Sequence, residues 1–573
     1  MQMRPPTAEL AQTPLFQLNT DALPHEERIS LGYTRARLVA QAYSAYFTTE
    51  DIRTLSPKFW AMHTDPIWAI DGSAAVLCTL QLNLVAGTLA MFSRKRPDVQ
   101  AVLDRMLTFE IAGQFCVTEL SHGLDAFHME TTATLLESGE WEIHTPNPGA
   151  AKYMPPTAPG GSPPAWGVVF ARAMVSGEDH GVKPFLFQFH DGKEMLPGIV
   201  ARLLPPRGGS HPLKHCLTSF EHLRVPASAL LGPVDKPADP RIAFFLNIQR
   251  VAIGTLAIGS LGYPSLQIAA TIAALYSRRR TVLDTFTQQP KTIFEFQTQK
   301  IPICTATAQA FVMEAFQDRC VKIFCDVDVD WRVRHAIAAI GKVVMLDHAQ
   351  EANLTLGERC GAQGLYTVNQ LTAMHADLRG TAIAEGDMLA ISIRFGTELL
   401  LDRYAVPPTA DPSSLLARHE AGTMEELRAR IREFGHHRTE SYNALILPEL
   451  MPLIKAIGHR LAYDAAVACG VDRSLVDLYV VSCVELDLGW YIERGLLTKR
   501  TYREMQAKAV EAVYQQIDAL VEKMDVGAYI KAPIVSEERW DAYLQTLPVY
   551  RAKSNSSRTV KRAVDYEFVS SRL

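Results

Sequence analysis

The segment FCVTELSHG, residues 115–123, divides the chain into two kinds of sequence. Before it, residues 21–110 contain few turn-forming residues. Stretches such as 35–45 (RARLVAQAYSA) place apolar residues three and four apart, the spacing of an amphipathic helix. After it, residues 146–164 hold seven prolines, a density that is incompatible with a helix. The chain therefore changes from helical to non-helical character at this segment.

Short apolar runs bounded by turn residues follow and predict β-strands. PPRGG at 205–209 marks one such boundary, and a proline-rich joint at 232–240 returns the chain to helical sequence. We therefore expect a compact β region between the two helical parts. Its predicted strands are 166–171 (WGVVFA), 184–190 (PFLFQFH), 199–204 and 217–225.

Helical sequence continues from residue 241 to about residue 525. Residues 334–359 predict one helix that stops before Gly361, and the prolines of 406–412 separate two helical parts. In the second part, Thr423 and Glu426 have the spacing of a capping box and predict a helix start.

The predicted fold class is α+β, mainly α. We expect an N-terminal helical domain, a central β-barrel-like domain, a helical bundle, an additional C-terminal helical domain and a flexible tail. The predicted boundaries are 1–110, 111–235, 236–405, 406–549 and 550–573.

Composition excludes some classes of protein. The 573 residues are 48% hydrophobic and 21% charged, as in ordinary globular proteins, with a net charge of −5. Without a basic excess to displace counterions, nucleic acid is not an expected partner. The nine cysteines are scattered without a CxxC pair, which favours a reduced intracellular compartment. The N-terminus lacks the apolar core of a signal peptide.

Two uncharged stretches, 74–92 and 251–276, are long enough to be tested as membrane spans. The first contains several polar residues, and the second contains three glycines and a proline. Helices buried in a large bundle are the better interpretation of both, so no transmembrane segment is predicted.

Common catalytic and metal motifs are missing from the sequence. It contains no Walker loop, GxGxxG, HExxH or GxSxG pattern, and His436-His437 lies beside charged residues at an expected helix end. We therefore predict no metal site.

Six segments, taken in order, do carry a resemblance. The segment at 115–123 contains TELSHG, and far downstream stands AEGD at 384–387. Between them lie 220–226 (FEHLRVP) with 230–232, 276–280, 296–299 (FQTQ) and 360–364 (CGAQG). In order and spacing they resemble the acyl-CoA dehydrogenase and oxidase flavoprotein superfamily. The acyl-CoA oxidase branch matches this chain better, because its members typically have TELGHG at the first of these segments. Residues 493–533 are also similar to the C-terminal part of oxidases.

The resemblance implies a fold and a reaction. The family has a helical domain, a β domain and a helical bundle, and oxidases add a further helical domain. It implies an FAD-dependent oxidoreductase of fatty acid β-oxidation and lipid metabolism that desaturates an acyl-CoA thioester between Cα and Cβ. FAD is needed because no side chain accepts a hydride, and O2 reoxidises the flavin to give H2O2.

Glu385 is the expected catalytic base for the α-proton. An apolar pocket raises the pKa of a carboxylate toward neutrality, which suits this task. The ordinary alternative for a Glu-Gly pair is a surface glutamate before a turn. The resemblance further implies that Arg250 and Gly386 contact substrate.

Other matched positions are implied to bind the cofactor. Thr118 is expected against the flavin ring, and Arg280 at the FAD pyrophosphate of the neighbouring subunit, with its register among residues 278–280 left open. That shared site implies a homodimer. The remaining implied cofactor contacts are Gln297, Gly361, Gly364 and Gly160.

Three departures from the family pattern leave alternatives open. Residues 152–157 are KYMPPT, where oxidases usually have a sequence like KWWPGG. Met388 stands where the family usually has an asparagine, and the chain is shorter than typical oxidases. A related flavoenzyme with a specialised-metabolism substrate is therefore a second hypothesis. A dehydrogenase with another electron acceptor and a redox-silent paralogue are further ones.

The chain ends in Ser571-Arg572-Leu573, a variant of the peroxisomal SKL signal. We therefore expect a peroxisomal protein that is recognised by the import receptor through this tripeptide.

Overall fold

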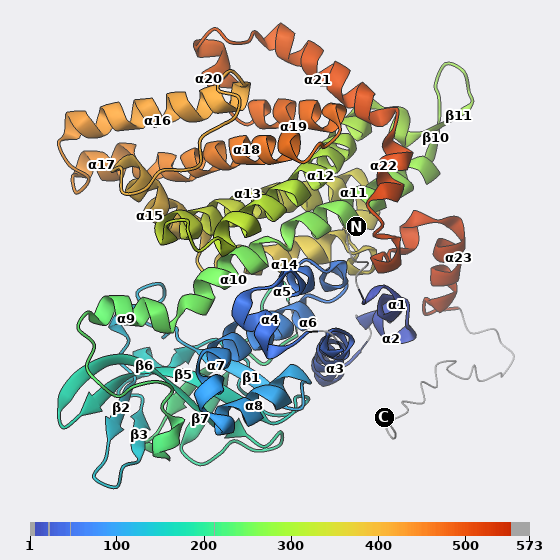
Figure 1. Cartoon of the computed structure of the whole chain (residues 1–573). Helices are drawn as coiled ribbons and strands as arrows, with labels where there is room; N and C mark the ends of the chain where they lie inside the picture. The colour runs from blue at the N-terminus through green and yellow to red at the C-terminus, as the bar shows by residue number, and fades with distance from the viewer. Residues whose placement is uncertain (1–5, 21–22, 46, 211, 552–573) are drawn as a thin grey trace, which may run out of the picture.

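The computed structural model describes residues 6–20, 23–45, 47–210 and 212–551. Helices dominate, and strands are concentrated in one central stretch of the chain (Figure 1). The predicted fold class, mainly α with an inserted β part, is confirmed. The terminal tripeptide at 571–573 lies outside the described residues.

The N-terminal part is a set of short helices around one longer helix. Their packing buries large side chains such as Phe16, Tyr43 and Phe59. Between α6 and α7 the backbone continues without a break through a π-helical segment, Thr79–Val85. The helices are α1 Ala8–Ala11, α2 Pro14–Gln17, α3 His25–Ser44, α4 Thr49–Thr54, α5 Pro57–His63, α6 Gly72–Cys78, α7 Ala86–Phe92 and α8 Pro97–Leu107.

The β part consists of two sheets. In the larger one, the long strands β5 and β6 form an antiparallel pair, while β1 and β2 lie in turn along the other edge of β5, both parallel to it. Strands β3 and β9 extend this sheet, and a smaller sheet has the order β4-β8-β7. The strands are β1 Ala112–Cys116, β2 Thr132–Leu135, β3 Trp141–His144, β4 Lys152–Tyr153, β5 Ala165–Val175, β6 Glu178–His190, β7 Ile199–Leu203, β8 Cys216–Phe220 and β9 Leu223–Val225.

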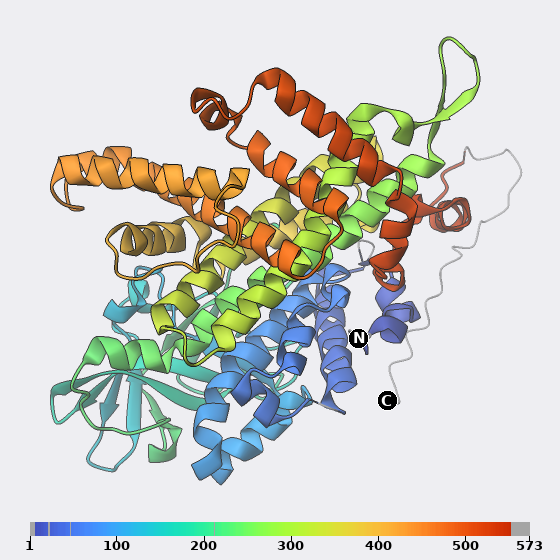
Figure 2. The ribbon, with the colours of Figure 1, turned by 45° about the horizontal axis from the view of Figure 1, so that its top comes forward.

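A bundle of long helices follows and crosses the centre of the molecule (Figures 1 and 2). Helix α13 is its middle member and packs against α10, α11, α12, α14 and α15. Apolar residues occur on every side of α13, as expected for a helix surrounded by others. The helices are α9 Pro240–Asn247, α10 Gln249–Gly259, α11 Gly262–Arg279, α12 Gln297–Cys325, α13 Trp331–Arg359, α14 Leu371–Ile383 and α15 Met388–Leu400.

Two stretches of the described chain, Gly72–Lys95 and Gln249–Arg279, are long and apolar enough to cross a membrane by length and composition alone. Their most apolar windows are 67% and 78% buried inside the protein. Both stretches contain the segments that the sequence predicts to be buried helices, and they pack as core helices do.

The C-terminal helices form a layer over one side of the bundle, with α20 and α21 uppermost in Figure 1. Their bounds are α16 Leu415–Phe434, α17 Glu440–Leu445, α18 Leu450–Ala468, α19 Arg473–Glu485, α20 Leu488–Glu493, α21 Lys499–Tyr514, α22 Ile517–Lys523 and α23 Glu537–Thr546.

The predicted capping box at Thr423 is wrong. Helix α16 begins at the N-cap Ser414, whose hydroxyl accepts a hydrogen bond from the Ala417 amide at 3.3 Å. Thr423 and Glu426 therefore lie inside the helix. A Thr-x-x-Glu pattern in a helix interior looks the same in sequence as one at a helix start.

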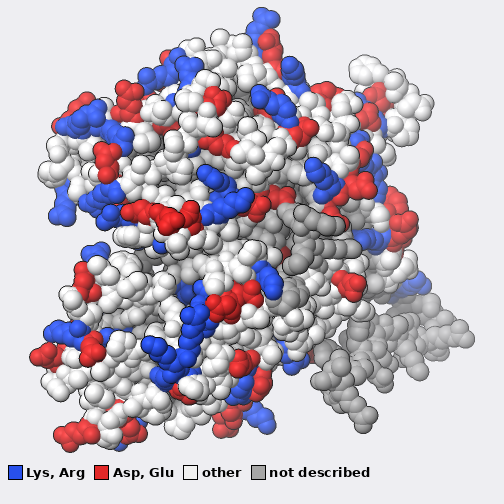
Figure 3. All heavy atoms as spheres, in the orientation of Figure 1, with Lys and Arg blue, Asp and Glu red and all other residues white. Residues whose placement is uncertain are grey.

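A hairpin between α11 and α12 projects from the molecule at the upper right of Figure 1. It is formed by β10 Thr281–Leu283 and β11 Pro290–Thr292, and Phe286 at its tip is 95% exposed. Elsewhere on the face shown in Figure 3, Lys and Arg are interspersed with Asp and Glu rather than gathered by sign.

Candidate active site

Glu385 lies in the short connection between α14 and α15. Its backbone φ is 52°, in the left-handed region that few non-glycine residues adopt, and Gly386 follows with a φ of 101°. Asp387 then caps α15 by accepting hydrogen bonds from the Leu389 amide at 3.0 Å and the Ala390 amide at 3.1 Å. The AEGD segment thus makes a sharp turn that aims the glutamate side chain away from both helix axes.

The Glu385 carboxylate points against α10. A Cβ atom built on Gly254 would lie 1.2 Å from its Oε2, so only glycine leaves room at that position. Asn83 Nδ2 donates a long hydrogen bond of 3.4 Å to the same oxygen. The carboxylate is therefore enclosed, and it has only this weak hydrogen bond among the described residues.

Burial raises the pKa of Glu385 to about 8, against the lowering effect of the Lys342 and Arg250 charges. A carboxyl group that titrates in this range is suited to remove a weakly acidic proton near neutral pH. Desolvation dominates because the two cations lie nearby without forming an ion pair with Glu385.

Arg250 is held beside Glu385 by the N-terminal helices. Its Nε donates to the Asn83 carbonyl at 3.0 Å and its Nη1 to the Ile52 carbonyl at 3.1 Å, while the guanidinium lies 5.3 Å from the Phe59 ring centroid. Gly87 leaves the room for it, because a Cβ there would lie 2.0 Å from Nε. The cation is 3% exposed and fixed in place.

Two buried polar atoms beside the glutamate have no partner among the described residues. They are Arg250 Nη2 and Asn83 Oδ1. Buried polar groups are nearly always hydrogen-bonded, so these atoms suit a bound polar group or water. The donor and acceptor fit the polar parts of a thioester or of a flavin ring.

Asn83 belongs to the π-helical segment between α6 and α7. The wider turn rotates the residues that follow it around the helix axis. The Asn83 side chain donates to Glu385, and the Asn83 carbonyl accepts from Arg250. Such π segments are frequent at functional sites. Neither the π segment nor Asn83 was predicted, and an asparagine in an apolar helical stretch is the signal that points to it.

Among the predicted residues, the structure brings Glu385, Gly386 and Arg250 together. Thr118 lies in the β part just after β1, and its carbonyl accepts from the Tyr153 amide at 2.9 Å. Gly160 has a φ of 89°, but its N–H already donates to the Gly192 carbonyl at 3.2 Å. That amide is thus not free for a cofactor, and a contact there would have to use other atoms of the loop.

The other predicted cofactor residues lie on a different surface. Arg280 directly follows α11, Gln297 begins α12 and Gly361 follows α13, and all three are exposed. The three helix ends are connected, since the Arg280 carbonyl accepts from the Ile293 amide and the Gln299 side chain donates to the Arg359 carbonyl.

Gly364 has a packing reason to be glycine. A Cβ there would lie 1.9 Å from the Gly357 carbonyl oxygen of α13. The backbone of Gly364 therefore packs closely against α13, which is reason enough for a glycine there. A contact of Gly364 with the cofactor stays a prediction.

A buried ion pair explains part of the TELSHG segment. Lys152 Nζ donates to Glu119 at 2.9 Å, with both side chains fully buried, and Glu119 also accepts from the backbone amides of Glu130 and Thr131. Lys152 starts the altered KYMPPT loop, so this ion pair anchors the loop to the TELSHG segment.

Lys342 was not predicted either. It is fully buried in the middle of α13, and its Nζ donates to the carbonyls of Ala384 and Gly386, the latter at 2.6 Å. A single lysine in the apolar run 336–346 (AIAAIGKVVML) is the signal that sequence reasoning missed, because lysine is almost never fully buried without a partner.

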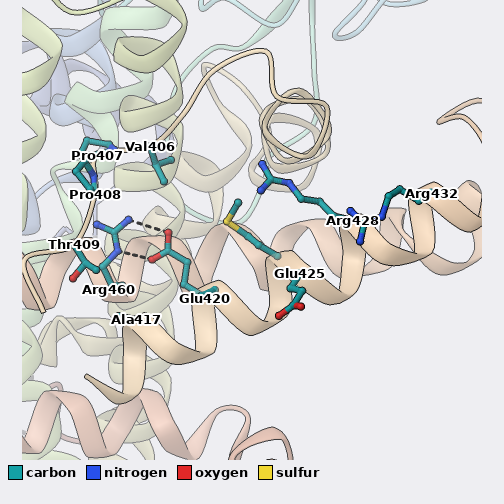
Figure 4. Close-up of a pocket in the computed structure, with 12 residues that line it drawn as sticks. Val406, Pro407, Pro408, Thr409, Ala417, Glu420, Glu425, Arg428, Arg432 and Arg460 are labelled. Carbon is teal, nitrogen blue, oxygen red and sulfur yellow. Dashed lines mark hydrogen bonds and ion pairs between the residues drawn. The ribbon is translucent and has the colours of Figure 1, made fainter. Parts of the chain in front are cut away.

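A cavity of about 410 Å³ lies elsewhere, among the C-terminal helices (Figure 4). Two hydrogen bonds join Arg460 to Glu420 at its wall, that from Nη2 at 2.9 Å, and Arg460 Nη1 also donates to Asp464 at 3.2 Å. Arg460 and Glu420 are paired within the chain, so we interpret the cavity as a gap beside a structural ion pair and not as the reaction site. It is lined by Val406, Pro407, Pro408, Thr409, Ala417, Glu420, Ala421, Met424, Glu425, Arg428, Arg432 and Arg460.

One group of described residues has metal-ligating atoms close together. Ligand atoms of His348, His459 and Cys483 all lie within 4.8 Å of one another in the core between α13, α18 and α19. The two imidazoles stack at 5.2 Å, and Tyr479 packs edge-on against His348, which is ordinary aromatic packing.

Comparisons with known proteins agree with this architecture. The family model described as "Acyl-CoA oxidase, C-alpha1 domain" matches residues 256–400. Peroxisomal acyl-coenzyme A oxidase 3 of Homo sapiens is 26% identical over 409 residues, which are 66% of this chain and 57% of that protein. Acyl-coenzyme A oxidase 2, peroxisomal, of Arabidopsis thaliana is 25% identical over 60% of this chain and 52% of its own length. The matches thus span little more than half the length of these relatives.

Solved structures extend the similarity over nearly the whole chain. Acyl-CoA oxidase 3 from Yarrowia lipolytica has a TM-score of 0.81 at 18% identity and covers 96% of this chain and 89% of its own. Acyl-CoA oxidase-1 of Caenorhabditis elegans, solved in complex with FAD and ATP, has a TM-score of 0.77 at 18% identity and covers 95% and 90%. At these identities the likeness establishes the fold.

Fold and sequence are thus both similar to one class of protein, the acyl-CoA oxidases. The match over 256–400 and the relatives just described confirm the resemblance to the acyl-CoA oxidase branch that the sequence motifs predict.

Proposed function

We propose that this protein is an FAD-dependent acyl-CoA oxidase-like enzyme. The reaction is α,β-desaturation of an acyl thioester with O2 as electron acceptor, giving H2O2. The observation that carries the proposal is the enclosed carboxylate of Glu385, with its raised pKa, at the turn between α14 and α15. FAD, when bound, supplies the acceptor for the β-hydride.

The chain's own groups then have separate tasks. Glu385 removes the α-proton in its ionised form, and Arg250 Nη2 offers a donor on the same side of the site. Asn83 Oδ1 offers an acceptor. Gly254 keeps the carboxylate tight against α10, which excludes water from one side of it.

The cofactor-binding and dimer proposals rest on the exposed helix ends. Arg280, Gln297 and Gly361 gather there, beside the projecting hairpin with the exposed Phe286. A charged group with glycine beside it suits a pyrophosphate, and an exposed location suits a contact with a second subunit. We therefore assign these residues to FAD of a partner subunit in a homodimer.

Peroxisomal localisation is part of the proposal. It is supported by peroxisomal relatives and by the terminal Ser571-Arg572-Leu573 sequence. A fusion of a fluorescent protein to residues 550–573 should enter peroxisomes, and deletion of the last three residues should leave it in the cytosol.

The activity is tested by peroxide release from the FAD-loaded protein with short, medium and long acyl-CoA esters. A clear optimum of chain length supports the oxidase. If substrate bleaches the flavin but no peroxide forms, the protein is instead a dehydrogenase that passes its electrons to another acceptor. Bound flavin that no acyl-CoA ester bleaches would contradict the acyl-CoA substrate and favour a specialised thioester, for which the KYMPPT loop is the sequence argument.

A further inference from the structure

Lys342 is a buried cation that forms no ion pair with any described residue. It is fully buried, although a lysine in such surroundings normally has a carboxylate partner. Its ammonium instead donates to two backbone carbonyls, Ala384 and Gly386, the residues on either side of Glu385. The charge is therefore used to hold the turn that carries the proposed base.

Thr255 binds the carbonyl of Glu385, which lies between the two carbonyls that Lys342 binds. Its hydroxyl donates to the Glu385 carbonyl at 2.7 Å. Three consecutive carbonyls, from Ala384 to Gly386, are thus each bound by a side chain from a neighbouring helix. No such set is needed for an ordinary helix connection, where carbonyls bind water or nearby amides.

The restraint acts where the backbone is least stable by itself. Glu385 has a φ of 52°, a conformation that is unfavourable for a non-glycine residue. A loop left free would relax toward more favourable angles and move the carboxylate away from Gly254. Fixed carbonyls on both sides prevent this relaxation.

Close helix packing brings Lys342 into reach. A Cβ built on Gly259 would lie 2.7 Å from Lys342 Cα and 2.8 Å from its Cβ, so α10 and α13 touch at this point. Gly254, Thr255 and Gly259 all lie on α10. Helix α10 thus leaves room for the glutamate, binds its carbonyl and leaves room for the lysine.

Charge adds a second effect. The charged groups that face Glu385 are Lys342 and Arg250, and those that face Lys342 are Glu385 and Asp387. Burial lowers the pKa of Lys342 to about 8, while the two carboxylates oppose the shift. Protonated Lys342 favours ionised Glu385, because an opposite charge nearby lowers the pKa of a carboxyl group.

We propose that Lys342 is the positioning residue of the catalytic glutamate: it fixes the turn around Glu385 through the two flanking carbonyls and stabilises the ionised carboxylate. This inference rests on the proposed role of Glu385 as base. Lys342 acts through Glu385 and does not itself touch substrate.

The variants Lys342→Met and Lys342→Gln separate the two effects. Methionine has a similar length but neither charge nor donor, whereas glutamine keeps a donor for the carbonyls. We expect K342M to lower kcat about 100-fold with KM nearly unchanged, and K342Q to lower it about 10-fold. In both, the rise of kcat/KM with pH should move up by about one pH unit, because the charge that favours the ionised glutamate is gone.

Lys183→Met is the matched control. Lys183 is also a buried lysine that donates to a carbonyl, that of Asp235 at 2.9 Å, but it lies in β6. K183M should change neither the pH profile nor the ratio of kcat to KM. A K342M profile with the wild-type pH dependence, or one that K183M reproduces, would overturn the proposal.

Hydrogen exchange gives a readout that does not need activity. Peptides that cover residues 384–390 should exchange faster in K342M and K342Q than in wild type, with no change in K183M. Unchanged exchange there would contradict the restraint. Faster exchange in a protein that is inactive with every thioester would support the restraint and count only against the proposed function.

The variant Thr255→Val gives an independent test, because it removes one hydroxyl at nearly constant volume. If K342M does not fold, T255V still probes the same turn. Its loss of kcat should be smaller, about 3- to 10-fold, since two of the three carbonyls remain bound and one hydrogen bond contributes about 1 kcal/mol. An unchanged kcat and unchanged exchange at 384–390 would contradict the proposal.

Discussion

Two buried groups of charges in this protein are built in opposite ways. At Glu420, Arg460 donates two hydrogen bonds to one carboxylate and a third to Asp464, so positive and negative charges are paired by direct contact (Figure 4). At Glu385, the carboxylate has one hydrogen bond of 3.4 Å, and the nearby Lys342 binds carbonyls instead. The first arrangement joins two helices, and the second leaves a carboxylate with little to stabilise its charge.

The contrast between Glu420 and Glu385 shows how a buried glutamate near basic residues can serve either stability or reactivity. Burial raises the pKa of Glu420, while the hydrogen bonds and the charge of Arg460 oppose this rise. A carboxylate that is enclosed but not paired has its pKa raised and becomes a useful base. Direct pairing with a cation, and not burial alone, separates the two sites.

The largest effect is expected from Glu385→Gln. The amide has the same shape but cannot accept the α-proton, so turnover should fall at least 1000-fold, within the range that general bases contribute. Single-turnover bleaching of bound flavin by substrate measures this step. FAD content should stay at the wild-type level, and an E385Q protein with a tenth of the normal rate would remove Glu385 as base.

Arg460→Met tests the other side of the comparison. Removal of this guanidinium leaves Glu420 buried without its partner, which typically costs 3–5 kcal/mol of stability. Denaturant unfolding measures the loss, and the pH profile of the remaining folded enzyme should be unchanged. The exposed pair of Arg428 and Asp402 supplies the control, since R428M should cost less than about 1 kcal/mol. Equal losses in both variants would contradict the contrast.

Gly254→Ala probes the fit of the Glu385 carboxylate against α10. The new methyl group would lie 1.2 Å from Oε2 in the present arrangement and must displace it. We expect a loss of kcat of about 100-fold, near 2.7 kcal/mol of barrier, from a misplaced base. Gly489→Ala is a control, because nothing lies within 4 Å of a Cβ there. A fully active G254A would show that the carboxylate does not work from this position.

The smallest effect is on stability as a function of pH. The folded-state pKa of Glu385 is about 8, above its ordinary value of 4.5, so the folded protein binds the extra proton more tightly. Its contribution to stability is complete below pH 4.5 and is lost as the pH rises through 8.

E385Q has no such proton to lose. It should therefore gain stability relative to wild type between pH 5 and pH 9, by about 1 kcal/mol or more. Unfolding midpoints at the two pH values measure this difference. A difference of zero or of opposite sign would contradict the raised pKa.

The order of helical and β parts could be predicted because it depends on local features. Proline density, apolar spacing and turn residues change where the chain passes into and out of the sheets, and these signals need no tertiary contacts. Glu385 and Arg250 were found through motifs that resemble a family. Local pattern failed at Thr423, where a sequence typical of a helix start lies within α16.

The partners of the glutamate were not predicted because they come from distant parts of the chain. Asn83 contacts Glu385 across 302 positions, and Thr255 across 130. The conformation of Asn83 further depends on a π segment, which no local spacing indicates. Lys342 gave a signal, a lone charge in apolar sequence, but its target carbonyls became evident only from the packing of α13 against α10.

Helix α13 has a further consequence as a spacer. Lys342 lies near its middle, and Arg359, at its last turn, accepts the hydrogen bond from Gln299 at the exposed helix ends. Arg359 lies seventeen positions after Lys342 on the helix, a rise of about 26 Å, so the rigid helix sets the distance from the turn of Glu385 to the exposed surface. Insertion of a single residue between them would turn one end against the other by about 100°. Length changes in homologous chains should therefore avoid this stretch and collect in the connections before and after it.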